Sequence, residues 1–509
     1  MKKSITKAAM LVVLLEIIMK IFAFVKQAVV AYYFGANGQT DVYFVANDFM
    51  VSVSETLVSA AKIAVISVYT AICVREGKKE GDKLLSGFFV LMICFAIVIV
   101  ISVNVFSVPL ANVLAPFFSS VQNSQLQIYI SKLSGIVMFT SIIMIMEAVM
   151  NSNEVFVVAR IRSFIYSGCV ICACIIASQQ GIGVLINAQY SSFFIYMIIL
   201  MIAVRPYYKF SFCNPWTNRH INEVVKIMLP ALIGNSIVRI NYLVDKAVAS
   251  SVVDGGVSAL AYCQTLDQFV VVVIINSICS IMFAHFANLV AEGKKSEIDD
   301  RIDNVLCALT LILVPVTLVV CMSSENIVQI VFGRGKYETK MIGITASALV
   351  GYSIRYLFVG IRDVVIQVLY AYHETKAPMM NSVVCTIINV IVSVCGVKKY
   401  GILAIAIGTS ISAFVGMLLN IKRFLRYNKT YSFEHLIKII IHGIPGGIFA
   451  ICGCWWINHL EGLNSLICFI VKTFVVFGGF YISLLVSKDS KTIFFLKKIR
   501  YMLNRSESF

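Results

Sequence analysis

The chain has 509 residues, of which 59% are hydrophobic and only 13% are charged. This balance excludes an ordinary soluble domain and is typical of a polytopic membrane protein. The net charge of +16 would also suit a nucleic-acid-binding protein. However, the lysines and arginines form short clusters between apolar runs, so we expect anionic membrane lipids as their partners and no nucleic acid. The 15 cysteines lie mostly within apolar runs, which indicates small core residues and not a disulfide framework or a metal site.

Runs of about 20 apolar residues predict an all-α polytopic membrane protein with about fourteen transmembrane helices. The first run is too long for a cleavable signal peptide and contains internal lysines. The predicted helices extend approximately over residues 8–34, 42–73, 84–115, 126–151, 155–178, 181–204, 222–250, 256–292, 302–322, 341–371, 378–397, 401–421, 435–458 and 464–486.

The basic residues between these runs alternate along the chain. The connections at 35–41, 113–125, 179–181, 251–256 and 457–463 contain no lysine or arginine, whereas most of the other connections are basic. Since basic loops stay on the cytoplasmic side, this alternation predicts that both termini are cytoplasmic. The exceptions lie in two loops that we expect outside, and they are Arg334, Lys336, Lys340, Lys398 and Lys399.

A short internal repeat favours a two-lobed architecture. Residues 28–31 (AVVA) and 38–40 (GQT) are echoed, 218 positions later, by 246–249 (KAVA) and 256–258 (GVS). Transporters built from such repeats bind substrate near the repeat interface. We therefore predict two pseudo-symmetric six-helix lobes, then two C-terminal helices with a basic tail, over residues 1–210, 211–425 and 426–509.

Several basic residues lie inside the predicted spans, where a charge is costly and normally has a partner or a function. Arg239 and Lys246 are seven residues apart, as are Arg355 and Arg362, so each pair shares one helical face. One interpretation is that these cations pair with embedded carboxylates and only fix helix packing. The other is a hydrated cavity for a phosphate or pyrophosphate, which suits both Lys and Arg. The candidate substrate-binding residues are Lys20, Lys26, Asp41, Lys62, Arg239, Lys246, Arg355 and Arg362.

Asp245, near the end of the seventh predicted helix, has three interpretations. Its carboxylate could pair with a basic residue on a neighbouring helix, or it could take part in a proton relay. It could also bind a small metal cation together with Asn389 and Thr409, since a carboxylate, an amide and a hydroxyl are oxygen ligands that suit sodium.

No enzymatic motif is present in the sequence. The six histidines are scattered, and there is no HExxH, nucleophile elbow or P-loop. We therefore expect a transporter and not an enzyme, with no required cofactor. Its energy would come from an ion gradient, for which sodium is the candidate ion, or from the membrane potential.

Five stretches resemble the signatures of one transporter family. Residues 24–46 contain FVKQAVVA, FGA and TDVYFVA, residues 225–262 contain VK, PA and VSALAY, and residues 332–337 read FGRGKY. Residues 370–378 read YAYHETKAP, and residues 401–410 contain GILA and GTS. In this order and spacing the motifs resemble the MurJ/MviN family of lipid II flippases, within the multidrug/oligosaccharidyl-lipid/polysaccharide exporter superfamily.

The resemblance implies two six-helix lobes with two extra helices, alternating access, and a lipid-linked sugar pyrophosphate as cargo. It also implies a location in the bacterial cytoplasmic membrane, where the cargo is flipped from the inner to the outer leaflet. The family carries arginines where this chain has Lys20 and Lys26, and a further arginine near Ser54. It carries an arginine and a glutamate where this chain has Thr265 and Gln268, so the chain resembles a divergent member.

We therefore expect a monomeric flippase for an undecaprenyl-pyrophosphate-linked glycan, with lipid II of peptidoglycan synthesis as the first candidate. Three alternatives remain: a flippase for a capsule or exopolysaccharide repeat unit, a drug/cation antiporter of the same superfamily, and a non-transporting scaffold for glycan synthesis. A basic cavity disfavours the antiporter, because a cationic cargo needs acidic and aromatic surroundings.

Overall fold

The computed structural model describes residues 2–153, 155, 158, 161–211, 213–216, 218–429, 431–459, 464–489 and 491–494. For residues 2–17, 238, 280, 281, 283, 284, 295 and 296 it describes the backbone alone. These described residues form helices and loops, without a β-strand among them. The basic tail predicted beyond residue 494 lies outside this part of the chain.

The α-helices follow one another along the whole chain, with a π-helical segment, Val271–Asn276, between two of them. They are α1 (Lys2–Phe34), α2 (Gly38–Arg75), α3 (Lys78–Val105), α4 (Ser107–Leu114), α5 (Ser120–Ser134), α6 (Ile136–Ser152), α7 (Arg162–Ala177), α8 (Val184–Val204), α9 (Arg219–Ala249), α10 (Gly256–Val270), α11 (Ser277–Ala291), α12 (Lys295–Val331), α13 (Thr339–Ser353), α14 (Tyr356–Ala371), α15 (Lys376–Tyr400), α16 (Ile402–Phe424), α17 (Glu434–Asn458) and α18 (Ser465–Val486).

The predicted polytopic all-α fold is confirmed. Within the described residues, 12 helices are long and apolar enough to cross a membrane, or 13 when the bent pair α13–α14 is one span. These spans correspond in order to the second to fourteenth predicted helices, and α1 corresponds to the first. Some predicted spans are not single straight helices: α13 and α14 meet at a 41° bend.

The chain divides into two compact units, which we describe separately. Unit 1 is Met1–Tyr262 with Gly335–Tyr337, and unit 2 is Cys263–Arg334 with Glu338–Phe509. The predicted boundary at residue 210 does not coincide with this division, because α9 packs along α2 within unit 1.

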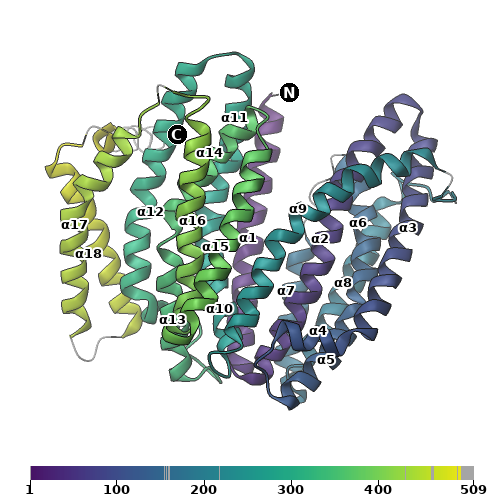
Figure 1. Cartoon of the computed structure of the whole chain (residues 1–509), viewed down its shortest axis with the longest axis horizontal. Helices are drawn as coiled ribbons and strands as arrows, with labels where there is room; N and C mark the ends of the chain where they lie inside the picture. The colour runs from purple at the N-terminus through teal and green to yellow at the C-terminus, as the bar shows by residue number, and fades with distance from the viewer. Residues whose placement is uncertain are drawn as a thin grey trace. The chain divides into compact units, whose positions relative to one another are not determined.

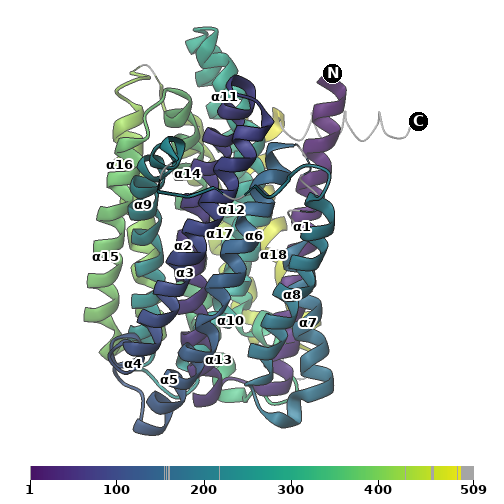
Figure 2. The ribbon, with the colours of Figure 1, turned by 90° about the vertical axis from the view of Figure 1, so that its right-hand side faces the viewer.

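In unit 1, α2 is the central helix. It packs against α3, α5, α6 and α9, while α1 packs on α7 and α7 on α8 (Figure 2). Its start is fixed by Asn37, whose side chain accepts hydrogen bonds from the backbone N–H groups of Gln39 and Thr40. The Thr40 hydroxyl in turn accepts the Asn37 N–H at 2.8 Å. This reciprocal capping box explains why the helix begins directly after the Phe34–Gly38 turn.

The segment Gly335–Tyr337 belongs to unit 1 because it docks on the end of α1. The Lys336 N–H donates to the carbonyl of Tyr32 at 2.9 Å. Gly335 has a φ of +67°, and a Cβ there would collide with the backbone of Tyr32. Both the left-handed conformation and the close approach require glycine at this position of the FGRGKY motif.

In unit 2, α12 packs against α13, α17 and α18, and α15 packs against α16 (Figure 1). A core of Cys307, Leu311, Ile439, Phe480 and Leu484 joins α12 to the α17–α18 pair. The two C-terminal helices that follow the predicted lobes are therefore packed against a helix of the second lobe, through buried apolar side chains that favour the packed state.

Candidate substrate site

The first hairpin of unit 1 meets the start of α10 at the positions of the sequence repeat. The hydroxyls of Ser258 and Thr40, which are 218 residues apart, hydrogen-bond to each other at 2.7 Å. One turn further along both helices, the rings of Phe44 and Tyr262 contact edge to face at 5.5 Å. This second pair has the same separation as the first. Equivalent residues that touch each other are typical of a local twofold relation, so the repeat has a counterpart in the structure.

Asp41 is a buried and fully hydrogen-bonded member of the predicted substrate residues. It is 1% exposed, and its carboxylate accepts the N–H groups of Gly255 at 2.8 Å and Ser258 at 2.7 Å. It also accepts the Ser258 hydroxyl at 2.5 Å. A carboxylate on the free N–H groups at the start of a helix satisfies those donors and complements the helix dipole. We therefore interpret Asp41 as the cap of α10.

Lys62, on α2, is paired within unit 1. Its Nζ lies 2.6 Å from an Oε of Glu147 on α6, and the other Oε of Glu147 accepts the Tyr196 hydroxyl at 2.8 Å. A second pair, Arg162 with Glu55 at 3.3 Å, links α7 to α2. Sequence reasoning missed Glu147 and Arg162 as charged partners. Glu147 could have been found by the criterion applied to the lysines, which is a single charge inside an apolar run.

A second group of charges surrounds Asp48 on α2. Lys246, whose side chain is buried, lies with its Nζ 3.2 Å from an Oδ of Asp48. Lys26 lies over the ring of Tyr166 at 4.4 Å, a cation–π distance, and interacts electrostatically with Asp48 and with Lys20. Asp48 therefore faces two lysines, and Lys20 adds a third positive charge near Lys26, which leaves this part of unit 1 with surplus positive charge.

Lys20 and Arg239 differ from the other embedded cations of unit 1. Lys20 is exposed on α1 and Arg239 is half-buried on α9. Neither forms a hydrogen bond or an ion pair with another side chain in the described part of the chain. A cation at membrane depth without a partner normally faces water or an anionic ligand. These two residues, with Lys26, are the strongest candidates for contact with an anionic substrate.

The predicted cations of unit 2 both have carboxylate partners. The Arg355 guanidinium, at the bend between α13 and α14, makes two bonds to Asp267, which is 1% exposed. Arg362 on α14 bonds to the adjacent Asp363 at 2.8 Å. The two arginines were predicted to share one face of a single helix, but the chain bends at Arg355, which precedes the first turn of α14.

The residues of the predicted cation site lie in both units. Asp245 is buried in unit 1. In unit 2, the buried Asn389 accepts the Ser393 hydroxyl at 3.2 Å, and the Thr409 hydroxyl donates to the carbonyl of Ile405 at 3.1 Å. Among the described residues, no group of three or more His, Cys, Asp and Glu side chains is arranged to hold a metal ion.

Comparison with known proteins places the chain in a family. A family model described as lipid II flippase MurJ matches residues 30–476, which is most of the sequence. The chain belongs to the lipid II flippase MurJ family. The predicted resemblance is therefore confirmed.

Two relatives in the MurJ family match this chain over most of its length. The probable lipid II flippase MurJ of Buchnera aphidicola is 25% identical over 94% of this chain and 95% of its own. That of Vibrio cholerae is 22% identical over 82% of each chain. Identities of this size fit the prediction of a divergent member.

Solved structures support the same fold. A lipid II flippase MurJ in an inward closed conformation matches with a TM-score of 0.78 and 18% identity, over 93% of this chain and 99% of that chain. An inward-facing multidrug resistance MATE family transporter of the MOP superfamily matches with a TM-score of 0.67 and 14% identity, over 81% of this chain and 96% of that one. At these identities the likeness concerns the fold. This chain is thus a multi-span membrane protein with the fold of these transporters.

Proposed function

We propose that this protein translocates lipid II, an undecaprenyl-pyrophosphate-linked precursor of peptidoglycan, from the inner to the outer leaflet of the bacterial cytoplasmic membrane. The observation that carries this proposal is the match of the lipid II flippase family model to residues 30–476. The surplus positive charge in unit 1 supports it, because the pyrophosphate of such a substrate is anionic.

Within unit 1, we assign the pyrophosphate to Lys20, Lys26 and Arg239. Lys20 and Arg239 lack a carboxylate partner among the described residues, and Lys26 shares Asp48 with Lys246. Lys62, Lys246, Arg355 and Arg362 would first have to leave their carboxylates. In this mechanism, alternating access moves the polar head across the membrane in contact with protein side chains. The lipid tail stays in the hydrocarbon of the bilayer.

Sodium is our proposal for the coupling ion. Asp245, a buried carboxylate of unit 1, is the predicted ligand on which this proposal is based. If sodium binds the native state, it raises the apparent stability by mass action. Thermal unfolding of the purified protein should then shift upward in sodium chloride relative to choline chloride. An identical melting temperature in the two salts would refute the proposed sodium site.

The remaining parts of the proposal concern orientation and partners. The alternation of basic loops supports cytoplasmic termini, and it supports contact of those loops with anionic lipid headgroups. We propose that the protein acts as a monomer and without ATP hydrolysis, since the sequence contains no P-loop.

Rescue of a bacterial strain depleted of its own lipid II flippase tests the function. Expression of this chain should restore growth and lipid II in the outer leaflet. If the protein reaches the membrane in normal amounts and outer-leaflet lipid II stays absent, the substrate assignment is wrong. Restored export of a capsule repeat unit in a strain lacking that flippase would then support the main alternative.

A further inference from the structure

A polar hollow lies at one end of unit 1, where four of its loops meet. Residues from 35–41, 113–125, 179–181 and 251–256 line it, and all four connections lack lysine and arginine. The hollow has two adjoining parts of about 710 and 380 Å³, within the roughly 300–1,000 Å³ of typical ligand sites. Both parts are lined by Gly38, Gln39, Val121 and Gln122. With the orientation proposed above, the hollow faces the outside of the cell.

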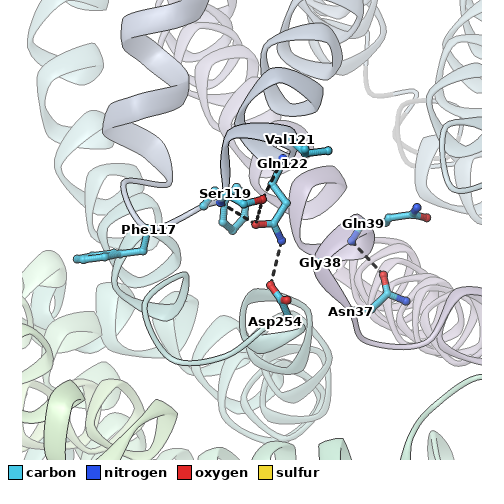
Figure 3. Close-up of a pocket in the computed structure, with 9 residues that line it drawn as sticks. Asn37, Gly38, Gln39, Phe117, Ser119, Val121, Gln122 and Asp254 are labelled. Atoms are coloured by element: carbon cyan, nitrogen blue, oxygen red, sulfur yellow. Dashed lines mark hydrogen bonds between the residues drawn. The ribbon is translucent and has the colours of Figure 1, made fainter.

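The side chain of Gln122 is held by hydrogen bonds to its neighbours and forms part of the wall of the hollow. The Gln122 Oε1 accepts the backbone N–H of Ser119 at 2.9 Å, and its Nε2 donates to Asp254 at 3.0 Å (Figure 3). Gly38 lies directly against this amide, so a side chain at Gly38 would displace it. The start of α5 and the loop before α10 are therefore joined by a hydrogen bond, and the start of α2 packs against the same amide.

Other polar groups that line the hollow have no such partner. The side-chain amides of Gln39, Gln125 and Gln180 make no hydrogen bond to any described residue. Tyr129 is only 8% exposed, and its hydroxyl has no hydrogen-bond partner in the described part of the chain. Most buried tyrosines pair their hydroxyl group, so this one is available to water or to a ligand in the hollow.

The chemistry of these groups suits a neutral ligand that is rich in hydroxyl and amide groups. Glutamine amides and a tyrosine hydroxyl both donate and accept hydrogen bonds, as sugar hydroxyl and acetamido groups do. Phe117, which is 65% exposed, offers an aromatic surface for the apolar face of a sugar ring. The charged residues at the hollow, Asp254 and Lys132, are of opposite sign, so a pyrophosphate finds no cationic cluster here.

We infer that this hollow is a saccharide-binding site, which receives the glycan head of the translocated lipid on the outer side of the membrane. The inference rests on the proposed function for the identity of the glycan and for the orientation. It divides recognition of the substrate between two regions of unit 1. The pyrophosphate is held by cations within the membrane, and the sugar is held by amides at its outer end.

The test measures binding of a sugar that carries neither lipid nor phosphate. Purified full-length protein in lipid nanodiscs is titrated with a soluble N-acetylglucosamine disaccharide, and binding is followed by saturation-transfer NMR. Wild type should bind with a millimolar Kd. Gln125→Ala and Tyr129→Phe should each weaken binding by about fivefold, the effect of one lost hydrogen bond. The matched control is Gln179→Ala, because Gln179 is an exposed neighbour of Gln180 that does not line the hollow.

Three results would overturn the inference: absence of disaccharide binding to wild type, equal binding by wild type and both variants, or displacement of the disaccharide by inorganic pyrophosphate. Gln125 is exposed, so its variant tests the site even if Tyr129→Phe unfolds. The rescue experiment separates the two proposals. Rescue without disaccharide binding removes the saccharide site alone, whereas disaccharide binding without rescue removes the lipid II assignment and leaves the site.

Discussion

The two units differ in whether their embedded cationic side chains have bonding partners. In unit 2, Arg355 and Arg362 are bonded to aspartates, and the buried Lys472 donates to the carbonyl of Met322 and to Asn326. In unit 1, by contrast, Lys20 and Arg239 have no such partner among the described residues. A charge inside a span is therefore not by itself evidence of a substrate site. The partner decides whether that charge stabilises helix packing or remains available for an anionic ligand.

The largest effect should come from breaking the buried pair of unit 2. Asp267→Ala leaves the Arg355 guanidinium without its carboxylate, and removal of one partner of a buried pair costs about 3–5 kcal/mol of stability. Thermal unfolding in detergent measures this loss. Asp267→Ala combined with Arg355→Leu should recover part of it. If Asp267→Ala is as stable as wild type, then this pair does not hold α10 against the α13–α14 bend.

Replacing the cations without partners should lower activity and leave stability unchanged. Lys20→Ala and Arg239→Ala each remove one charge-assisted contact to the pyrophosphate, which is worth roughly 10–100-fold in activity. Their melting temperatures should stay at the wild-type value, and Lys20→Arg should retain activity because the charge remains. Rescue of the flippase-depleted strain, with protein levels measured in parallel, checks this. Full rescue by both alanine variants would remove these residues from the substrate site.

Asp41→Asn tests the assignment of this residue to helix capping. The variant keeps one acceptor oxygen but loses the negative charge at the start of α10, so stability should fall by about 1–2 kcal/mol. Hydrogen exchange at the Gly255 and Ser258 amides should accelerate, because both amides bond to this carboxylate. Unchanged exchange together with lost translocation would instead indicate direct contact with substrate.

The smallest effect concerns a contact in unit 2 between Arg423, at the end of α16, and Glu374, in the loop between α14 and α15. The Arg423 guanidinium donates to Glu374 and holds the pKa of that carboxyl below its usual range. A lowered pKa in the folded state gives stability above the ordinary glutamate pKa, and this stability disappears as the pH falls through the lowered value. Glu374→Gln should flatten the acid side of the stability profile, by on the order of a degree in melting temperature. A profile identical to that of wild type would contradict this role.

The fold was largely predictable, because fourteen apolar runs and a 218-residue echo are long-range regularities that survive in a single sequence. The contacts of Thr40 with Ser258 and of Phe44 with Tyr262 follow that echo. The bend in the tenth predicted span was not predictable, because Ile354 and Arg355 are neither proline nor glycine, the residues that typically interrupt a helix. Nothing in the periodicity distinguishes a bend from a continuous helix there.

The site was predictable only in part. Embedded lysines and arginines are visible in the sequence, but pairing depends on which helices touch. Lys62 and Glu147 are separated by 85 residues, so only the packing of α2 on α6 brings them together. The outer hollow was not predicted at all. Its glutamines come from separate loops, and single polar residues in loops carry no signal of convergence.

The most direct test of the account is translocation of fluorescent lipid II by the purified protein in liposomes. Wild type should move the labelled lipid across the bilayer faster than protein-free vesicles do, and the variant lacking Lys20, Lys26 and Arg239 should not. Wild-type vesicles that translocate no more lipid II than empty ones, under conditions where an established flippase does, would contradict the proposed function.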